Sequence, residues 1–253
     1  MSHSDHSARE HYEKLAEGFD ANWAYSPPYL AWMTRCITSR ARLKTGDRVA
    51  DIGCGTGLYS RGLAAAAGAV ICADPSPAML AQLPPGPAFL PVQASAQDIA
   101  AGRVQLPYPE LDAIIVKEAI HHIPAPDRQH TLDGLASLLA HGGRIVLIML
   151  PRQISTPLFR AALELFERRQ PDPDSITGML ADAGLATRLD YESYPLAFPK
   201  QRYLDMVRAR YMSLLSEFGD QQIEDGIAEI DAAYPAGRLD FDDTFAFITG
   251  ERL

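Results

Sequence analysis

The chain of 253 residues has little positive charge and few lysines. Its 23 Lys and Arg residues stand against 32 Asp and Glu residues, for a formal net charge of −9. The basic residues are scattered, and only Lys14, Lys44, Lys117 and Lys200 are lysines. An acidic chain without a basic patch does not attract the phosphates of nucleic acid or of anionic membranes, so neither is expected as a partner.

Cysteines and long apolar runs are also scarce. The 3 cysteines are odd in number and widely spaced, which excludes a disulfide framework and a Cys-x-x-Cys metal site. No stretch approaches the roughly 18 apolar residues that a membrane span needs. Residues 1–7 are polar, so they predict no secretory signal. With an apolar share of 47%, the composition predicts a reduced, cytoplasmic globular protein.

Short apolar strands alternate with helical segments through the first 150 residues. Unbroken apolar strands separated by helices predict a parallel sheet that is covered on both faces. The expected strands are 48–52, 69–73, 89–92, 111–116 and 144–150, and the expected helices include 58–67 and 127–139. Later helices are expected at 156–169, 173–183, 200–218 and 221–234, with strands at 187–194 and 244–249.

A glycine-rich loop, 51–57, joins the first strand to its helix. Its spacing is Gly-x-Gly-x-Gly, with Leu58 where a dinucleotide fingerprint has its third glycine, and no Gly-Lys-Ser/Thr follows for a P-loop. Asp51 would repel a pyrophosphate but suits a cationic ligand, and Asp74 at the next strand end can accept both hydroxyls of a ribose. Each aspartate alone could be a capping or turn residue, but the pair beside the loop favours a ligand site.

Segment 49–57 followed by Asp74 resembles the class I S-adenosylmethionine-dependent methyltransferases, and the similarity continues through 96–98, 111–123 and 138–145. The resemblance implies an α/β fold with a Rossmann-like, doubly wound, mostly parallel seven-stranded sheet, its last strand antiparallel, and a helical cap insertion. It implies one domain over 1–253, with an N-terminal helical cap at 1–45, a cofactor-binding core at 46–150 and a helical lid at 195–238.

The resemblance also implies which residues hold S-adenosylmethionine. Asp51 would lie beside the ammonium, Asp74 would bind the ribose and Met79 would pack on the adenine. Lys117 would contribute backbone contacts, although small or polar residues are commoner there in the family. The implied cofactor residues are Tyr12, Trp23, Asp51, Gly53, Cys54, Gly55, Gly57, Asp74, Met79, Gln97, Asp98 and Lys117.

Two adjacent histidines, His121 and His122, follow the fourth strand and are candidate bases, because the histidine pKa lies near neutrality. One of them could instead satisfy a backbone carbonyl. Adjacent residues on a turn rarely bind one ion, so no metal is expected. Candidate substrate residues are Tyr25, Tyr203, Arg210 and Tyr211, where Arg210 could clamp a carboxylate. A packed core for the tyrosines and a solvated surface for the arginine are the alternatives.

The sequence therefore predicts an S-adenosylmethionine-dependent methyltransferase that acts on a small organic metabolite by in-line methyl transfer, as a monomer or homodimer. A lyase or cyclase of the same fold, which would release methylthioadenosine, is one alternative. A non-catalytic cofactor-binding module is another. A nicotinamide oxidoreductase is disfavoured by Leu58.

Overall fold

The computed structural model describes residues 26–253, which form a seven-stranded sheet in the order β3-β2-β1-β4-β5-β7-β6. β1 to β5 pair in parallel, and β7 runs antiparallel to β5. The strands are β1 (Val49–Ile52), β2 (Val70–Asp74), β3 (Phe89–Gln93), β4 (Leu111–Lys117), β5 (Leu139–Met149), β6 (Ala186–Pro199) and β7 (Arg238–Glu251). This architecture confirms the predicted fold class.

Helices begin where the sequence supplies caps. Ser26 accepts the Tyr29 N–H at 3.2 Å before Pro27, and Ser76 caps the helix that Pro77 opens. The α-helices are α3 (Pro27–Ala41), α4 (Ser60–Ala67), α5 (Pro77–Leu80), α6 (Ala96–Ala100), α7 (Arg128–Ser137), α8 (Arg160–Arg169), α9 (Pro173–Asp182), α10 (Lys200–Arg208) and α11 (Asp220–Ala233). The described residues also form the short 3₁₀ helices η1 (Ile120–His122), η2 (Ala125–Asp127) and η3 (Ser213–Glu217).

By its internal packing the chain divides into two compact units. Among the described residues, the first unit contains those up to Met149, Pro173–Asp190 and Ala246–Leu253. The second contains Leu150–Asp172 and Tyr191–Phe245. β6 and β7 run from one unit into the other, which makes them longer than the expected strands at 187–194 and 244–249.

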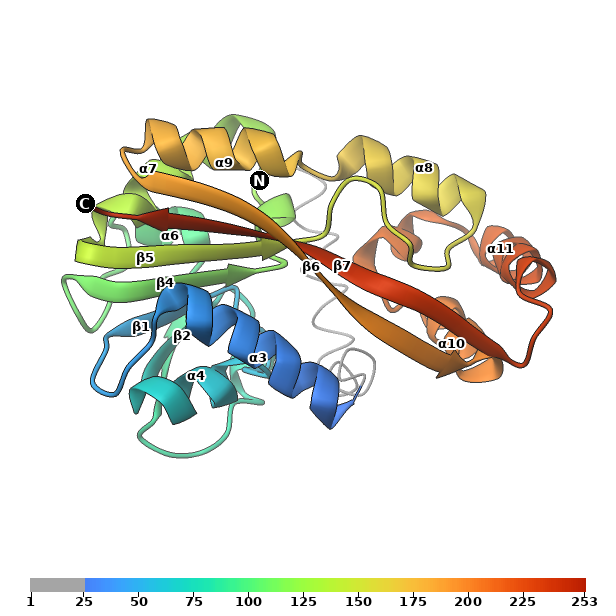
Figure 1. Cartoon of the computed structure of the whole chain (residues 1–253), viewed down its shortest axis with the longest axis horizontal. Helices are drawn as coiled ribbons and strands as arrows, with labels where there is room; N and C mark the ends of the chain where they lie inside the picture. Colours follow the sequence, from blue (N-terminus) through green and yellow to red (C-terminus); the bar gives the residue numbers. More distant parts are fainter. Residues whose placement is uncertain (1–25) are drawn as a thin grey trace. The chain divides into compact units, whose positions relative to one another are not determined.

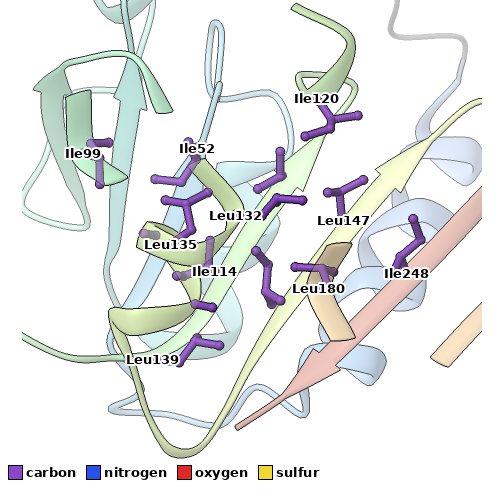
Figure 2. Close-up of a cluster of buried hydrophobic side chains, with 14 of the residues drawn as sticks. Ile52, Ile99, Ile114, Ile120, Leu132, Leu135, Leu139, Leu147, Leu180 and Ile248 are labelled. Carbon is purple, nitrogen blue, oxygen red and sulfur yellow. The ribbon is translucent and has the colours of Figure 1, made fainter. Parts of the chain in front are cut away.

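In the first unit, helices cover both faces of the sheet, with α3 and α4 on one face and α6, α7 and α9 on the other (Figure 1). This double cover explains why the central strands are apolar throughout rather than alternating. The cluster in Figure 2 lies on the second face, where Ile114 of β4 and Leu147 of β5 pack with Leu132 and Leu135 of α7 and Leu180 of α9. Successive side chains of a strand point to opposite faces of the sheet, and the neighbours Ala50, Ala73 and Val116 belong to this cluster. Asp51, Asp74 and Lys117 therefore point toward the face covered by α3 and α4.

The second unit has its own aromatic cluster. Phe198 stacks on Phe241 at 6.1 Å between ring centroids, and Tyr203 meets both rings edge-on. Tyr203 and Tyr211 share a buried hydroxyl–hydroxyl hydrogen bond of 2.9 Å. The single helix expected over 200–218 is wrong, because α10 ends at Arg208 and Arg210 takes a left-handed φ of 54° before η3.

No helix within residues 26–253 combines the length and the hydropathy that crossing a membrane requires.

Candidate active site

The carboxyl ends of β1, β2 and β4 meet at one edge of the sheet in the first unit. The register pairs Asp51 with Cys72, so the loop after β1 begins beside the end of β2. Because parallel strands all point their carboxyl ends at the same edge, Asp51, Asp74 and Lys117 come together there despite their separation in sequence.

The glycine loop turns sharply against β2. The N–H groups of Gly53 and Cys54 both donate to the Ala73 carbonyl, at 2.8 and 3.1 Å, and the Gly57 N–H donates back to Cys54 O at 3.0 Å. Gly53 has a φ of 76°, and a Cβ there would lie 2.6 Å from the Ala119 Cβ. Only glycine satisfies both conditions, so the loop passes close to the turn that follows β4.

Asp74 holds the loop with its carboxylate. Oδ2 accepts the Gly55 N–H at 2.9 Å, and Oδ1 accepts the Ser76 N–H at 2.8 Å. Burial raises the pKa of Asp74, and the two N–H groups work against that rise. A carboxylate has about four acceptor sites, so each oxygen of Asp74 can accept a further donor such as a ribose hydroxyl.

Asp51 is only 4% exposed, and its Oδ2 accepts the Ser60 hydroxyl at 2.6 Å. Burial raises the pKa of Asp51 to about 6, and the charge of Asp74 adds to the rise, while Ser60 and Lys117 oppose it. A ligand cation beside Asp51 would restore the ionised carboxylate. Ser60 could not be singled out from its sequence position, because its role depends on the turn that brings α4 back over β1.

Cys54 lies in the loop, where its thiol donates to Gly55 O at 3.5 Å and lies near the thiol of Cys72 in β2. The interaction with Cys72, together with burial, raises the pKa of the Cys54 thiol. Cys54 is therefore a neutral packing group beneath the loop at physiological pH, rather than a thiolate nucleophile.

The residues expected at the adenine lie on α5 and α6. Met79 is buried, and Gln97 is half-buried. Asp98 forms a capping box with Ser95, whose hydroxyl donates to Asp98 Oδ2 at 2.6 Å, and it pairs with Arg103 at 2.8 Å. These two partners hold the pKa of Asp98 below its usual range, so its carboxylate is already engaged in the α6 cap.

The end of β4 carries Lys117, whose Nζ lies 4.7 Å from the centre of the Tyr59 ring beside the glycine loop. Glu118, the next residue, takes a left-handed φ of 54° while its N–H donates to Ile148 O at 2.8 Å. A non-glycine residue in this conformation is strained by about 1–3 kcal/mol, and such strain is concentrated at functional sites.

The two candidate bases follow on η1, with ring centroids 4.0 Å apart. His121 Nδ1 is buried and has no hydrogen-bond partner within the described part of the chain. Burial lowers the pKa of His121 to about 4, and the charges of Arg128 and Lys117 lower it further. His121 is therefore a neutral imidazole at physiological pH, able to accept a proton but a weak base.

Three of the expected substrate residues, Tyr203, Arg210 and Tyr211, belong to the second unit. Tyr203 and Tyr211 are buried in the second unit, and burial raises the pKa of Tyr211. Arg210 Nη2 binds Asp220 Oδ1 at 2.7 Å and Phe218 O at 3.2 Å, so a clamp would first have to release these partners. Tyr12, Trp23 and Tyr25 lie outside the described residues.

Within residues 26–253, no group of three or more His, Cys, Asp or Glu side chains is arranged to hold a metal ion.

Comparisons with known proteins include the residues of this edge. A family model described as a methyltransferase domain matches residues 49–143. The ubiquinone biosynthesis O-methyltransferase of Dechloromonas aromatica (strain RCB) is 27% identical over 173 residues, which are 63% of this chain and 69% of that protein. The trans-aconitate 2-methyltransferase of Mycobacterium ulcerans (strain Agy99) is 30% identical over 167 residues, or 58% of this chain and 59% of that protein.

A solved structure from Anabaena variabilis, described as a candidate methyltransferase from an antibiotic biosynthesis pathway, has the same fold. Its TM-score is 0.66 at 19% identity, with 87% of this chain and 96% of that chain covered. The domain match spans the strands and the loop that build the edge described above. The domain match, the named relatives and the strand order together support an enzyme of the class I S-adenosylmethionine-dependent methyltransferase type.

Proposed function

We propose that the enzyme binds S-adenosylmethionine at the β1, β2 and β4 edge and transfers its methyl group to a small organic acceptor. One observation carries the proposal. Asp51 and Asp74 are both buried beside the glycine loop, and burial raises the pKa of each. The cation of such a ligand would stabilise the ionised form of Asp51, and its ribose hydroxyls would donate to the open acceptor sites of Asp74.

Each part of the cofactor then has residues to receive it. The glycine loop, including Cys54, would line the methionyl portion, with Asp51 beside the ammonium and the backbone at Lys117 opposite. Asp74 would bind the ribose. Met79 and Gln97 would meet the adenine, joined by the backbone of Asp98 because its carboxylate caps α6. The assignments of Tyr12 and Trp23 to the cofactor and of Tyr25 to the substrate stay predictions. So do those of Tyr203, Arg210 and Tyr211 to the substrate, which would require these side chains to release their present partners.

Methyl transfer to a small molecule requires positioning and exclusion of water more than strong acid–base chemistry. A base matters only where the acceptor must lose a proton early. His121 and His122 would serve in that role, and the low pKa of His121 leaves its imidazole unprotonated and ready to accept. The two named relatives act in ubiquinone biosynthesis and on trans-aconitate, which supports a small organic acceptor.

The test is incubation of the purified protein with S-adenosylmethionine, first alone and then with a metabolite extract, followed by mass spectrometry. We expect S-adenosylhomocysteine only when an acceptor is present, and none from an Asp74→Ala variant. Methylthioadenosine formed without an acceptor would contradict methyl transfer and would mean that the enzyme cleaves the cofactor. Calorimetry that detects no binding of S-adenosylmethionine would refute the cofactor assignment itself.

A further inference from the structure

Arg128 occupies a position that disfavours a positive charge. It is the first residue of α7, whose N-terminus already carries partial positive charge. It is half-buried, and burial lowers its pKa. Its Nε donates to Ile123 O at 2.9 Å, but no carboxylate among residues 26–253 pairs with the guanidinium, and both terminal nitrogens lack a partner there. A partly desolvated cation of this kind is costly unless an anion joins it.

His121 lies beside this guanidinium with a second unsatisfied polar atom, its buried Nδ1. The groups that act on the imidazole come from three elements: Lys117 at the end of β4, His122 on η1, and Arg128 on α7. Lys117 and Arg128 are both positive and both disfavour a protonated imidazole. The surroundings of His121 are therefore short of negative charge.

The position of the two groups relates them to the proposed reaction. η1 and the start of α7 directly follow β4, so His121 and Arg128 lie at the carboxyl edge that also carries the glycine loop. The Arg128–Ile123 hydrogen bond ties the first residue of α7 to the residue that closes η1. All of these residues belong to the first unit.

We propose that Arg128 and His121 bind a carboxylate of the methyl acceptor. The two terminal nitrogens of a guanidinium match the two coplanar oxygens of a carboxylate, and the imidazole can add a third donor. The single guanidinium fork of Arg128 matches one planar carboxylate. This proposal rests on the proposed function, because it names the class of acceptor for the same site.

Binding can be tested without turnover, on the full chain loaded with S-adenosylhomocysteine. Two-bond ¹H–¹⁵N spectra, assigned with a His121→Gln variant, would follow His121 during titration with benzoate and with its neutral counterpart benzamide. We expect benzoate, and not benzamide, to raise the pKa of His121, because a bound anion stabilises the imidazolium. Arg128→Met should weaken the binding of benzoate about tenfold or more. Arg128→Lys, which keeps the charge without the two parallel guanidinium donors, should weaken it less.

Arg188→Met is the matched control, since it removes an exposed arginine that pairs with Asp190 on β6, and it should leave benzoate binding unchanged. Equal binding of benzamide, tighter binding of phenyl phosphate, or undiminished benzoate affinity in Arg128→Met would each overturn the proposal. So would a fall in S-adenosylhomocysteine affinity in Arg128→Met, because Arg128 would then bind the cofactor's own carboxylate. Formation of S-adenosylhomocysteine from a metabolite extract tests the proposed function separately, whatever benzoate does.

Discussion

At the scale of single residues, two buried carboxylates carry most of the chemistry of the candidate site. Asp74 is fixed by the N–H groups of Gly55 and Ser76, so its orientation is set before any ligand arrives. Asp51 has the Ser60 hydroxyl and a raised pKa. The first is a preorganised acceptor, and the second is a group whose charge depends on pH and on the ligand.

Replacing Asp74 with Asn should weaken S-adenosylhomocysteine binding roughly tenfold to a hundredfold, because hydrogen bonds to a charged acceptor contribute about 1.5–3 kcal/mol. Titration calorimetry measures the change. Asp190→Asn removes a carboxylate that pairs with Arg188 on the first-unit part of β6, and its affinity should match that of the wild type. If the Asp74→Asn protein binds S-adenosylhomocysteine as tightly as this control does, Asp74 does not bind the ribose.

The ligand-free protein should lose stability through Asp51 as the pH rises. A folded pKa of about 6, above the ordinary 3.8, means that the stabilising contribution is complete below 3.8 and is lost as the pH passes through about 6. The loss by pH 7 is about 3 kcal/mol. In urea unfolding, the free energy of unfolding of the wild type should fall between pH 5 and pH 7 relative to that of Asp51→Asn, because the variant has no charge to bury. Parallel curves for the two proteins would contradict the raised pKa.

At the scale of elements, the glycine loop is set by backbone conformation and by close packing together. Gly53→Ala should destabilise the fold by about 1–3 kcal/mol, because it combines a left-handed φ with a Cβ that would meet Ala119. Gly178→Ala on α9 is the matched change, with an ordinary φ and open space around its Cβ, and it should stabilise by about 0.5–1 kcal/mol. Chemical unfolding measures the change in the free energy of unfolding for each variant. Equal changes would mean that the backbone conformation and close packing at Gly53 do not require glycine.

At the scale of the whole molecule, the two compact units should differ in their response to a local change. A Cβ at Gly226 of α11 would lie 2.4 Å from Phe159 Cδ1, and both residues belong to the second unit. Gly226→Ala should therefore cost about 1–3 kcal/mol in that unit. Hydrogen-exchange mass spectrometry should show faster exchange in α8 and α11 with β1 and β4 unchanged. Equal acceleration in both units would mean that they unfold together.

Local patterns in the sequence were enough to predict the sheet and the loop. Apolar runs at 69–73 and 111–116 reflect burial on both faces, and Ser76 before Pro77 specifies a helix start by its own chemistry. The break of the expected helix at Arg210 could not be predicted in this way. Its left-handed backbone is sustained by Phe218 and Asp220, which the sequence does not reveal as its partners.

The sequence alone determined the alternation of strands and helices, the glycine spacing, and the two aspartates at strand ends, because each depends on neighbouring residues and on strand direction. Only the tertiary structure decided which side chains already have partners. It engages Asp98 in a helix cap and Arg210 with Asp220, while leaving the terminal nitrogens of Arg128 and the Nδ1 of His121 without partners in the described chain. Hydrogen bonding and burial depend on residues far apart in sequence, and these decide which polar groups can receive a ligand.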